Sequence, residues 1–166
     1  MIKIILLLLI VVCFGYIGYG FSRYYTRRVK FFTNCIWLCE KLEVEINFSK
    51  KKLNEIINSQ IKNCSKDMQR CLIIYGDFLK DKENLFADKV SCELANLLTE
   101  DELSLFLLFL NSLGKFDIFN QVKEINNFNL KFKTYEKEAQ KDNKSFGTLF
   151  IKLGIIIGLL LAILLI

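Results

Sequence analysis

Cysteine is the residue type in this chain best suited to metal binding or redox chemistry. There are six cysteines, at positions 13, 35, 39, 64, 71 and 92, and no histidine. A zinc site would need cysteine and carboxylate ligands alone, and the spacings contain neither a C-x-x-C pair nor a recognisable disulfide framework. Cys35 and Cys39, four residues apart, share one face of a predicted helix. We predict packed free thiols.

Carboxylates offer the second kind of chemistry, general acid–base catalysis. Glu43 and Glu45 are two residues apart, so on a helix they point to different sides and do not easily share one substrate atom. Glu100, Asp101 and Glu102 lie in the first turn of a predicted helix, where carboxylates favour the helix dipole. The chain has no phosphate-binding loop, dinucleotide fingerprint or nucleophile elbow. We predict a protein that is not an enzyme and uses no cofactor or metal.

The elements that hold these residues lie between two apolar ends. Residues 148–166 carry one charge, Lys152, and the chain ends inside its most apolar stretch, which is expected of a membrane protein. A helix of that length reaches about 28 Å, roughly the thickness of a bilayer core. Residues 4–21 are uncharged, and tyrosines at positions 16, 19, 24 and 25 resemble an interfacial aromatic belt. We predict transmembrane helices at 1–22 and 148–166.

Two other interpretations apply to the first apolar segment. A signal peptide would share its basic start and apolar body, but no A-x-A-like cleavage site follows and the apolar stretch is longer than usual. Cys13 suggests a lipoprotein, but Val12 is bulkier than the small residue that such processing requires. A membrane-spanning hairpin is the favoured interpretation.

The distribution of basic residues predicts the side of the membrane on which the middle of the chain lies. The basic residues beside the two spans are Arg23, Arg27, Arg28 and Lys30, and Lys137, Lys141, Lys144 and Lys152. The positive-inside rule places residues 23–147 in the cytoplasm, and anionic lipid headgroups would attract this basic excess. No basic helix with interleaved aromatics is present, so no nucleic-acid partner is predicted.

The middle of the chain has a helical pattern throughout. Apolar residues recur every three or four positions in six segments, near 32–46, 53–64, 68–79, 86–97, 103–113 and 118–139. Ser49 and the pair Thr99 and Glu102 are candidate caps, and Gly114 is a candidate helix end. Seven of the eight residues from 103 to 110 are apolar, which predicts burial on most sides. The predicted fold is all-α, an antiparallel six-helix bundle (23–147) flanked by the two transmembrane helices.

Glycines offer a packing surface within the predicted spans. Gly154 and Gly158 form a G-x-x-x-G pattern, which lets another helix approach closely in lipid. Gly15 and Gly18 provide a matching small surface on the first span. Because glycine is common in membrane helices, chance occurrence is the alternative.

Several segments together resemble the stage III sporulation protein AB family. They are the N-terminal span with its tyrosines and arginines, LCEKLEVEI (38–46), FLLFLNSLGKFDIFNQVKEI (106–125) and the terminal KLGIIIGLLLAILLI. The segment 106–125 contains Leu-Gly-x-x-Asp (113–117) followed by Gln121. The resemblance covers the whole chain and is strongest in its last 60 residues.

The resemblance implies a role in a channel-like complex between mother cell and forespore. The family is similar to the membrane platform proteins of type II secretion and type IV pilus systems. The implied partners are a secretion-type ATPase, other membrane subunits, lipids and further copies of this chain. Two alternatives place the helical domain outside the cell: a two-span sensor, although no signalling domain follows the second span, and an oligomeric pore subunit, although neither span has a polar stripe.

Overall fold

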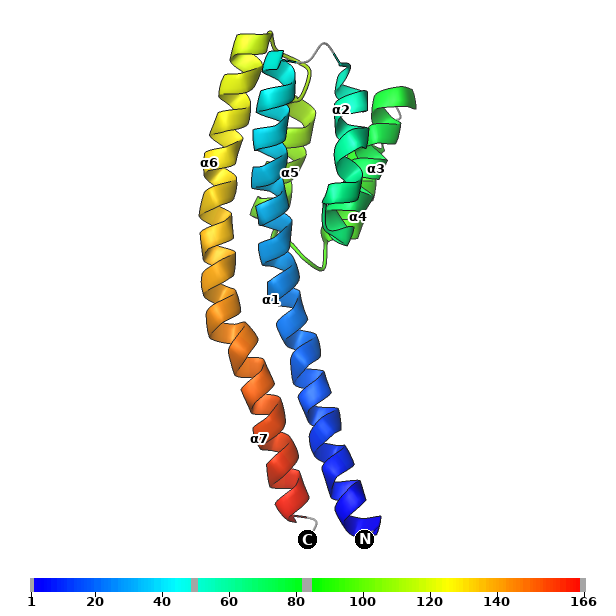
Figure 1. Cartoon of the computed structure of the whole chain (residues 1–166), viewed down its shortest axis with the longest axis vertical. Coiled ribbons are helices and arrows are strands. Elements are labelled where there is room, and N and C mark those ends of the chain that lie inside the picture. Colours follow the sequence, from blue (N-terminus) through cyan, green and yellow to red (C-terminus); the bar gives the residue numbers. More distant parts are fainter. Residues whose placement is uncertain (1, 49–50, 82–84, 165–166) are drawn as a thin grey trace. The chain divides into compact units, whose positions relative to one another are not determined.

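All regular secondary structure of the described residues is helical. The computed structural model describes residues 2–48, 51–81 and 85–164, and no strand occurs among them. In chain order the elements are α1 (Ile2–Phe48), α2 (Leu53–Gln60), the 3₁₀-helix η1 (Ile61–Asn63), α3 (Lys66–Asp81), α4 (Phe86–Leu94), α5 (Glu100–Ser112), α6 (Ile118–Asp142), the π-helix η2 (Asn143–Gly147) and α7 (Thr148–Leu164) (Figure 1). The all-α prediction is confirmed.

Two stretches of helix are much longer than the others. Helix α1 has 47 residues, and α6, η2 and α7 run on as one helix, Ile118–Leu164, also of 47 residues. The chain contains no proline, the residue that most strongly interrupts a helix. Long helices are therefore the expected outcome of this composition.

One helix in the described part of the chain is long and apolar enough to cross a membrane. It is Ile118–Leu164, whose most apolar window has a mean hydropathy of 2.5 and is only 17% buried. Such low burial suits a lipid-facing segment better than the core helix of a soluble protein. The predicted first span begins among residues 1–7, whose side chains lie outside the description, and the two-span arrangement stays a prediction.

The chain packs as two compact units. Met1–Val29 and Lys137–Ile166 form the first unit, and Lys30–Glu136 forms the second. In the first unit, Thr26 contacts Asn143 and Gly18 contacts Phe150, so α1 is antiparallel to η2 and α7. This division reflects packing, and the predicted domain limits at 22/23 and 147/148 stay predictions.

Aromatic rings from three helices fill the core of the second unit. The Phe106 ring of α5 is fully buried and lies edge-on to Phe31 of α1, with ring centroids 5.0 Å apart. Phe109 lies 5.4 Å from both Phe128 and Phe132 of α6. The buried Tyr75 hydroxyl of α3 donates a hydrogen bond to the Leu110 carbonyl, at 2.8 Å. Apolar packing and one satisfied polar group therefore join α1, α3, α5 and α6.

The predicted hydrophobic stripes are buried or half-buried, with two informative exceptions. Leu108 is 60% exposed, so α5 has an exposed strip, although the other six apolar residues from 103 to 110 are buried or half-buried. Ile118 is 63% exposed, although the residues that continue its stripe, Ile125 and Phe132, are fully buried. Periodicity identifies the apolar face of a helix, but it does not show that a neighbour covers the whole face.

The helix ends follow local chemistry. Thr99 and Glu102 form the predicted reciprocal capping box at the start of α5. Gly114 follows the end of α5 with φ of +77°, a conformation that costs a residue with a Cβ about 1–2 kcal/mol. Ser49, the other candidate cap, lies outside the described residues, and Lys52 occupies the position before α2 without a side-chain cap.

Candidate functional site

The thiols that the sequence offers for chemistry are mostly enclosed. All six cysteines are free. Cys35, Cys39, Cys64 and Cys71 are buried, as predicted, whereas Cys13 and Cys92 are exposed and the packing prediction is wrong for them. Burial raises the pKa of Cys64 to about 11 and that of Cys71 to about 12, since a buried thiolate loses its hydration. The same effect raises the pKa of Cys35 and Cys39. These thiols are protonated at neutral pH and suit packing better than nucleophilic or metal-binding roles.

Three of the five candidate carboxylates, Glu43, Glu45 and Glu102, have a structural partner. Glu43 accepts a hydrogen bond from the Asn126 amide at 3.2 Å, and Glu45 lies 3.6 Å from the Lys51 ammonium. Glu102 is buried in the capping box of α5. Within the described residues, no group of three or more Cys, Asp or Glu side chains is arranged to hold a metal ion. The contacts of these carboxylates stabilise the helical structure.

The four predicted packing glycines lie along the contact between α1 and α7, inside the first unit. A Cβ atom built on Gly154 would lie 2.5 Å from the Phe14 carbonyl oxygen, and one on Gly158 would lie 2.9 Å from the Val11 Cα. A Cβ on Gly18 would overlap the Phe150 carbonyl oxygen, whereas one on Gly15 would lie 3.9 Å from Ile155. Three of the four positions leave no room for a side chain.

Aromatic stacking borders this glycine contact. The rings of Phe21 and Phe150 stack at 5.5 Å between centroids, and Tyr25 stacks on Phe146 and Phe150 at 5.9 and 6.1 Å. The tyrosines at 16, 19 and 24, which resemble an interfacial belt, are exposed. Tyr25 instead packs against the opposite helix.

Polar side chains follow at the next turn, a cluster that the sequence analysis did not identify. The Thr26 hydroxyl is 3.3 Å from the Asn143 side-chain oxygen, and the Arg28 guanidinium donates to the Asp142 carboxylate at 2.7 Å. The Arg28 side chain is only 11% exposed, and a charge-assisted bond that close is among the stronger polar contacts. Ser22 and Thr26, four residues apart just beyond an apolar run, were the available sequence signal.

A π-helical turn accompanies this polar cluster. Residues Asn143–Gly147 adopt the wider helix, and the Asn143 side chain folds back over Gly147, where a Cβ would lie 2.7 Å from its oxygen. Ser22 borders the same space, with its hydroxyl 3.4 Å from that position. Single π-turns inside α-helices are rare and concentrate at functional sites.

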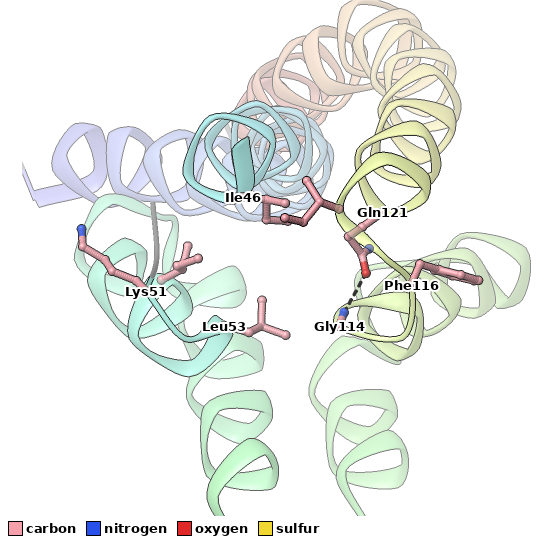
Figure 2. A pocket seen from close by; sticks show the side chains of 8 residues that line it. Ile46, Lys51, Leu53, Gly114, Phe116 and Gln121 are labelled. Atoms are coloured by element: carbon pink, nitrogen blue, oxygen red, sulfur yellow. Dashed lines mark hydrogen bonds between the residues drawn. The ribbon is translucent and has the colours of Figure 1, made fainter. Parts of the chain in front are cut away.

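The second unit contains the Leu-Gly-x-x-Asp motif as a tight turn between α5 and α6. The Gly114 N–H donates to the Gln121 side-chain oxygen at 2.8 Å (Figure 2). Asp117 accepts from the Asn120 side chain at 2.6 Å and from its backbone N–H at 3.1 Å, and these bonds lower the pKa of the carboxyl. Gly114 permits the turn, Asp117 caps α6, and the Gln121 side chain bonds α6 to the turn. Local geometry therefore explains the spacing of this motif.

The comparison with protein families agrees with this geometry. The family model of stage III sporulation protein AB matches residues 3–166 and covers both apolar ends and the motif at Gly114. The chain belongs to the stage III sporulation protein AB family. Neither the curated proteins nor the solved structures contain a match to it. Membership makes it a sporulation protein, and the apolar helix Ile118–Leu164 supports association with a membrane.

Proposed function

We propose that this chain is a non-catalytic platform component of the channel-like complex between mother cell and forespore. It couples a cytoplasmic secretion-type ATPase to membrane-embedded partners and is required for sporulation. The observation that carries the proposal is the family match over residues 3–166, because it includes the helical middle and both apolar ends. A helical unit with a packed aromatic core and a membrane-associated helix suits a role exerted through protein contacts.

In this proposal the chain crosses the membrane twice, at residues 1–22 and 148–166, and residues 23–147 lie in the mother-cell cytoplasm. Exposed basic residues support this orientation, namely Arg23, Arg27, Lys141 and Lys144. They adjoin the apolar ends of the chain, where anionic headgroups of the inner leaflet attract positive charge.

The glycines have a specific task in this proposal. Gly18, Gly154 and Gly158 let the two membrane helices approach until their backbones touch, which is the main source of helix association in lipid. Gly15 adds a small surface beside them. Close packing gives the platform one fixed arrangement of its spans, against which membrane partners assemble.

Reporter insertions test the orientation. Ala95 and Asn96 are exposed and lie between α4 and α5, so a reporter placed between them leaves both helices intact. A fluorescent protein at this site is expected to fluoresce, and alkaline phosphatase is expected to be inactive. Active phosphatase would instead place the helical unit outside the cell, as a sensor or external pore subunit requires.

Co-purification tests the coupling. The full-length chain in nanodiscs is expected to retain the ATPase of the same complex and to change its turnover of ATP. Empty nanodiscs provide the control for adsorption to lipid. An ATPase that neither binds the chain nor changes its turnover would remove the coupling role while leaving the family membership intact.

A further inference from the structure

A row of aromatic and basic residues follows α1 on the side that does not contact α7. This outer face consists of Tyr16, Tyr19, Gly20, Arg23 and Arg27, which recur at helical spacing. Tyr16 and Tyr19 are 75 and 53% exposed, both arginines are exposed, and a Cβ on Gly20 would meet nothing within 4 Å. Gly20 lies two residues after Gly18, which contacts α7, and two residues turn a helix by about 200°. The outer face is therefore not used in the contact between α1 and α7.

The two helices of the first unit change from apolar to basic residues at the same level. Gly18 contacts Phe150, and the helices are antiparallel, so the residues after Gly18 run alongside those before Phe150 (Figure 1). Arg23 and Lys144 are the first basic residues on each helix in this direction, five residues after Gly18 and six before Phe150. Coinciding transitions of this kind are expected where two helices leave the hydrocarbon and enter the headgroup layer.

The outer face has the length and the order of side chains that suit this layer. The interfacial layer on each side of a bilayer core is roughly 5–8 Å thick. Tyr19 and Arg23 are four residues apart, which corresponds to about 6 Å along a helix. Tyrosine favours the layer because its ring lies among apolar groups while its hydroxyl stays hydrated. With the tyrosines at the inner limit of the layer, Arg23 lies at the level of the lipid phosphates.

The charges of the first unit favour a lipid phosphate over a second copy of the chain. No Asp or Glu precedes Glu40 in the sequence, and the first unit contains eight lysines and arginines against two acids, Glu138 and Asp142. Asp142 is already bonded to Arg28 at 2.7 Å. A second copy would therefore bring mainly positive charge to the outer face, which is unfavourable, whereas anionic lipids supply phosphates at this level in excess.

Gly20 provides a place for one lipid molecule beside these charges. Its backbone is uncovered between Tyr16 and Tyr24, which lie one turn before and one turn after it and are 75 and 37% exposed. A glycerol backbone can lie against the main chain there, and Arg23 follows three residues later on the same face. The guanidinium presents a planar fork that matches two phosphate oxygens, whereas lysine offers only a point charge.

We propose that the outer face of α1 binds one anionic phospholipid, with its phosphate on the Arg23 guanidinium and its glycerol backbone against Gly20. Arg27, one turn further along α1, adds a second positive charge beside the headgroup. The inference deepens the proposed function, on which it rests only for the first membrane span. It assigns a single bound molecule to named residues, which differs from a general attraction between basic residues and the membrane surface.

Native mass spectrometry of the full-length chain tests the proposal by counting bound lipid molecules. The chain, in micelles of a non-ionic detergent, is titrated with dioleoylphosphatidylglycerol and separately with dioleoylphosphatidylcholine, whose headgroup has no net charge. The first phosphatidylglycerol is expected to bind about fivefold more tightly, or more, than the first phosphatidylcholine. Glycerol 1-phosphate supplies the phosphate without acyl chains and is expected not to displace the bound lipid.

Charge-matched variants separate a lipid site from general attraction. Arg23→Gln is expected to weaken binding of the first phosphatidylglycerol by about tenfold or more, and Arg23→Lys by less, since lysine keeps the charge but loses the fork. Lys144→Gln removes the same charge from an exposed position of the facing helix and should change the affinity by about twofold or less.

A second pair of variants tests the contact with the glycerol backbone. Gly20→Leu covers the backbone at this position and should weaken binding of the lipid by about threefold or more, whereas Ser145→Leu adds a leucine at an exposed position of η2 and should not. Protease resistance equal to that of the unsubstituted chain confirms that each variant folds.

The outcomes distinguish this inference from the proposed function. Equal affinity for the two lipids, equal effects of Arg23→Gln and Lys144→Gln, an unaltered affinity in Gly20→Leu, or displacement by glycerol 1-phosphate overturns the lipid site, even if the ATPase co-purifies. A second copy of the chain bound in place of the lipid overturns it as well, and Arg23→Lys that binds as the unsubstituted chain does removes the two-oxygen contact. Selective lipid binding with the expected sensitivity supports the site, and it stands even if the reporter lies outside the cell or the ATPase does not bind.

Discussion

Replacing Gly154 by leucine is expected to separate α1 from α7. Even the first added carbon would lie 2.5 Å from the Phe14 carbonyl oxygen and 3.3 Å from its carbonyl carbon. Ordinary contact begins near 3.4 Å, so the backbones must move apart by about 1 Å before the leucine is accommodated. Gly20→Leu is the matched control, because a Cβ on Gly20 would meet nothing within 4 Å.

The expected size of the effect follows from this displacement. A gap of about 0.5–1 Å removes roughly a quarter to a half of the dispersion energy of each atom pair along the contact. Overpacking of this kind typically costs about 1–3 kcal/mol. The population of closely paired helices should therefore fall by about fivefold or more.

Disulfide cross-linking measures that population directly. Gly15 and Ile155 are suitable partners, since a Cβ on Gly15 would lie 3.9 Å from the Ile155 Cγ1, and both are replaced by cysteine in a background without Cys13 and Cys92. In nanodiscs, Gly154→Leu should slow bond formation about fivefold or more, and Gly20→Leu should leave the rate unchanged. Equal rates in both variants would refute the argument that glycine sets the distance between the helices.

Three further predictions concern the second unit. Phe106→Ala removes the ring 5.0 Å from Phe31 and should destabilise the unit by about 3–5 kcal/mol in chemical denaturation; a wild-type midpoint would contradict the core assignment. Gly114→Ala should cost about 1–2 kcal/mol in the same assay because its φ is +77°, and an unchanged midpoint would mean that the turn relaxes. Stability should fall as pH rises from 9 toward 12, since unfolded thiols ionise near their usual pKa of 9.0 while the folded-state pKa values of Cys64 and Cys71 are about 11 and 12; alanine at both positions should weaken this dependence, and an identical pH profile would contradict it.

Local features of the sequence predicted local features of the structure. The capping box at Thr99 and the end of α5 at Gly114 each depend on residues within a few positions of one another. The spacing of apolar residues likewise identified the helices, because one period of 3.6 residues governs both pattern and burial.

The candidate sites depend on contacts that spacing does not encode. Leu53 and Gln121 are 68 positions apart in the chain, and the pocket that both line exists only after α2 packs near the turn at Gly114 (Figure 2). The exposure of Ile118 was likewise not predictable. Its stripe continues into the core, but Ile118 itself lines the same pocket as Leu53 and Gln121. The glycine pattern was visible, but Phe14 and Val11 emerged as its contacts only from the structure.

The π-helical turn at Asn143–Gly147 determines how the side chains of α7 are rotated about the helix axis. Ala139, Gly147 and Gly154 are buried at steps of eight and then seven residues, and the wider turn absorbs the additional residue in the first step. In a uniform α-helix each residue rotates the chain by about 100°, so deleting one residue between Ala139 and Gly147 would shift the glycine face by about a quarter turn. The length of this short segment is thus as restrictive as its composition: a single-residue deletion would point Gly154 and Gly158 away from α1 without altering either glycine.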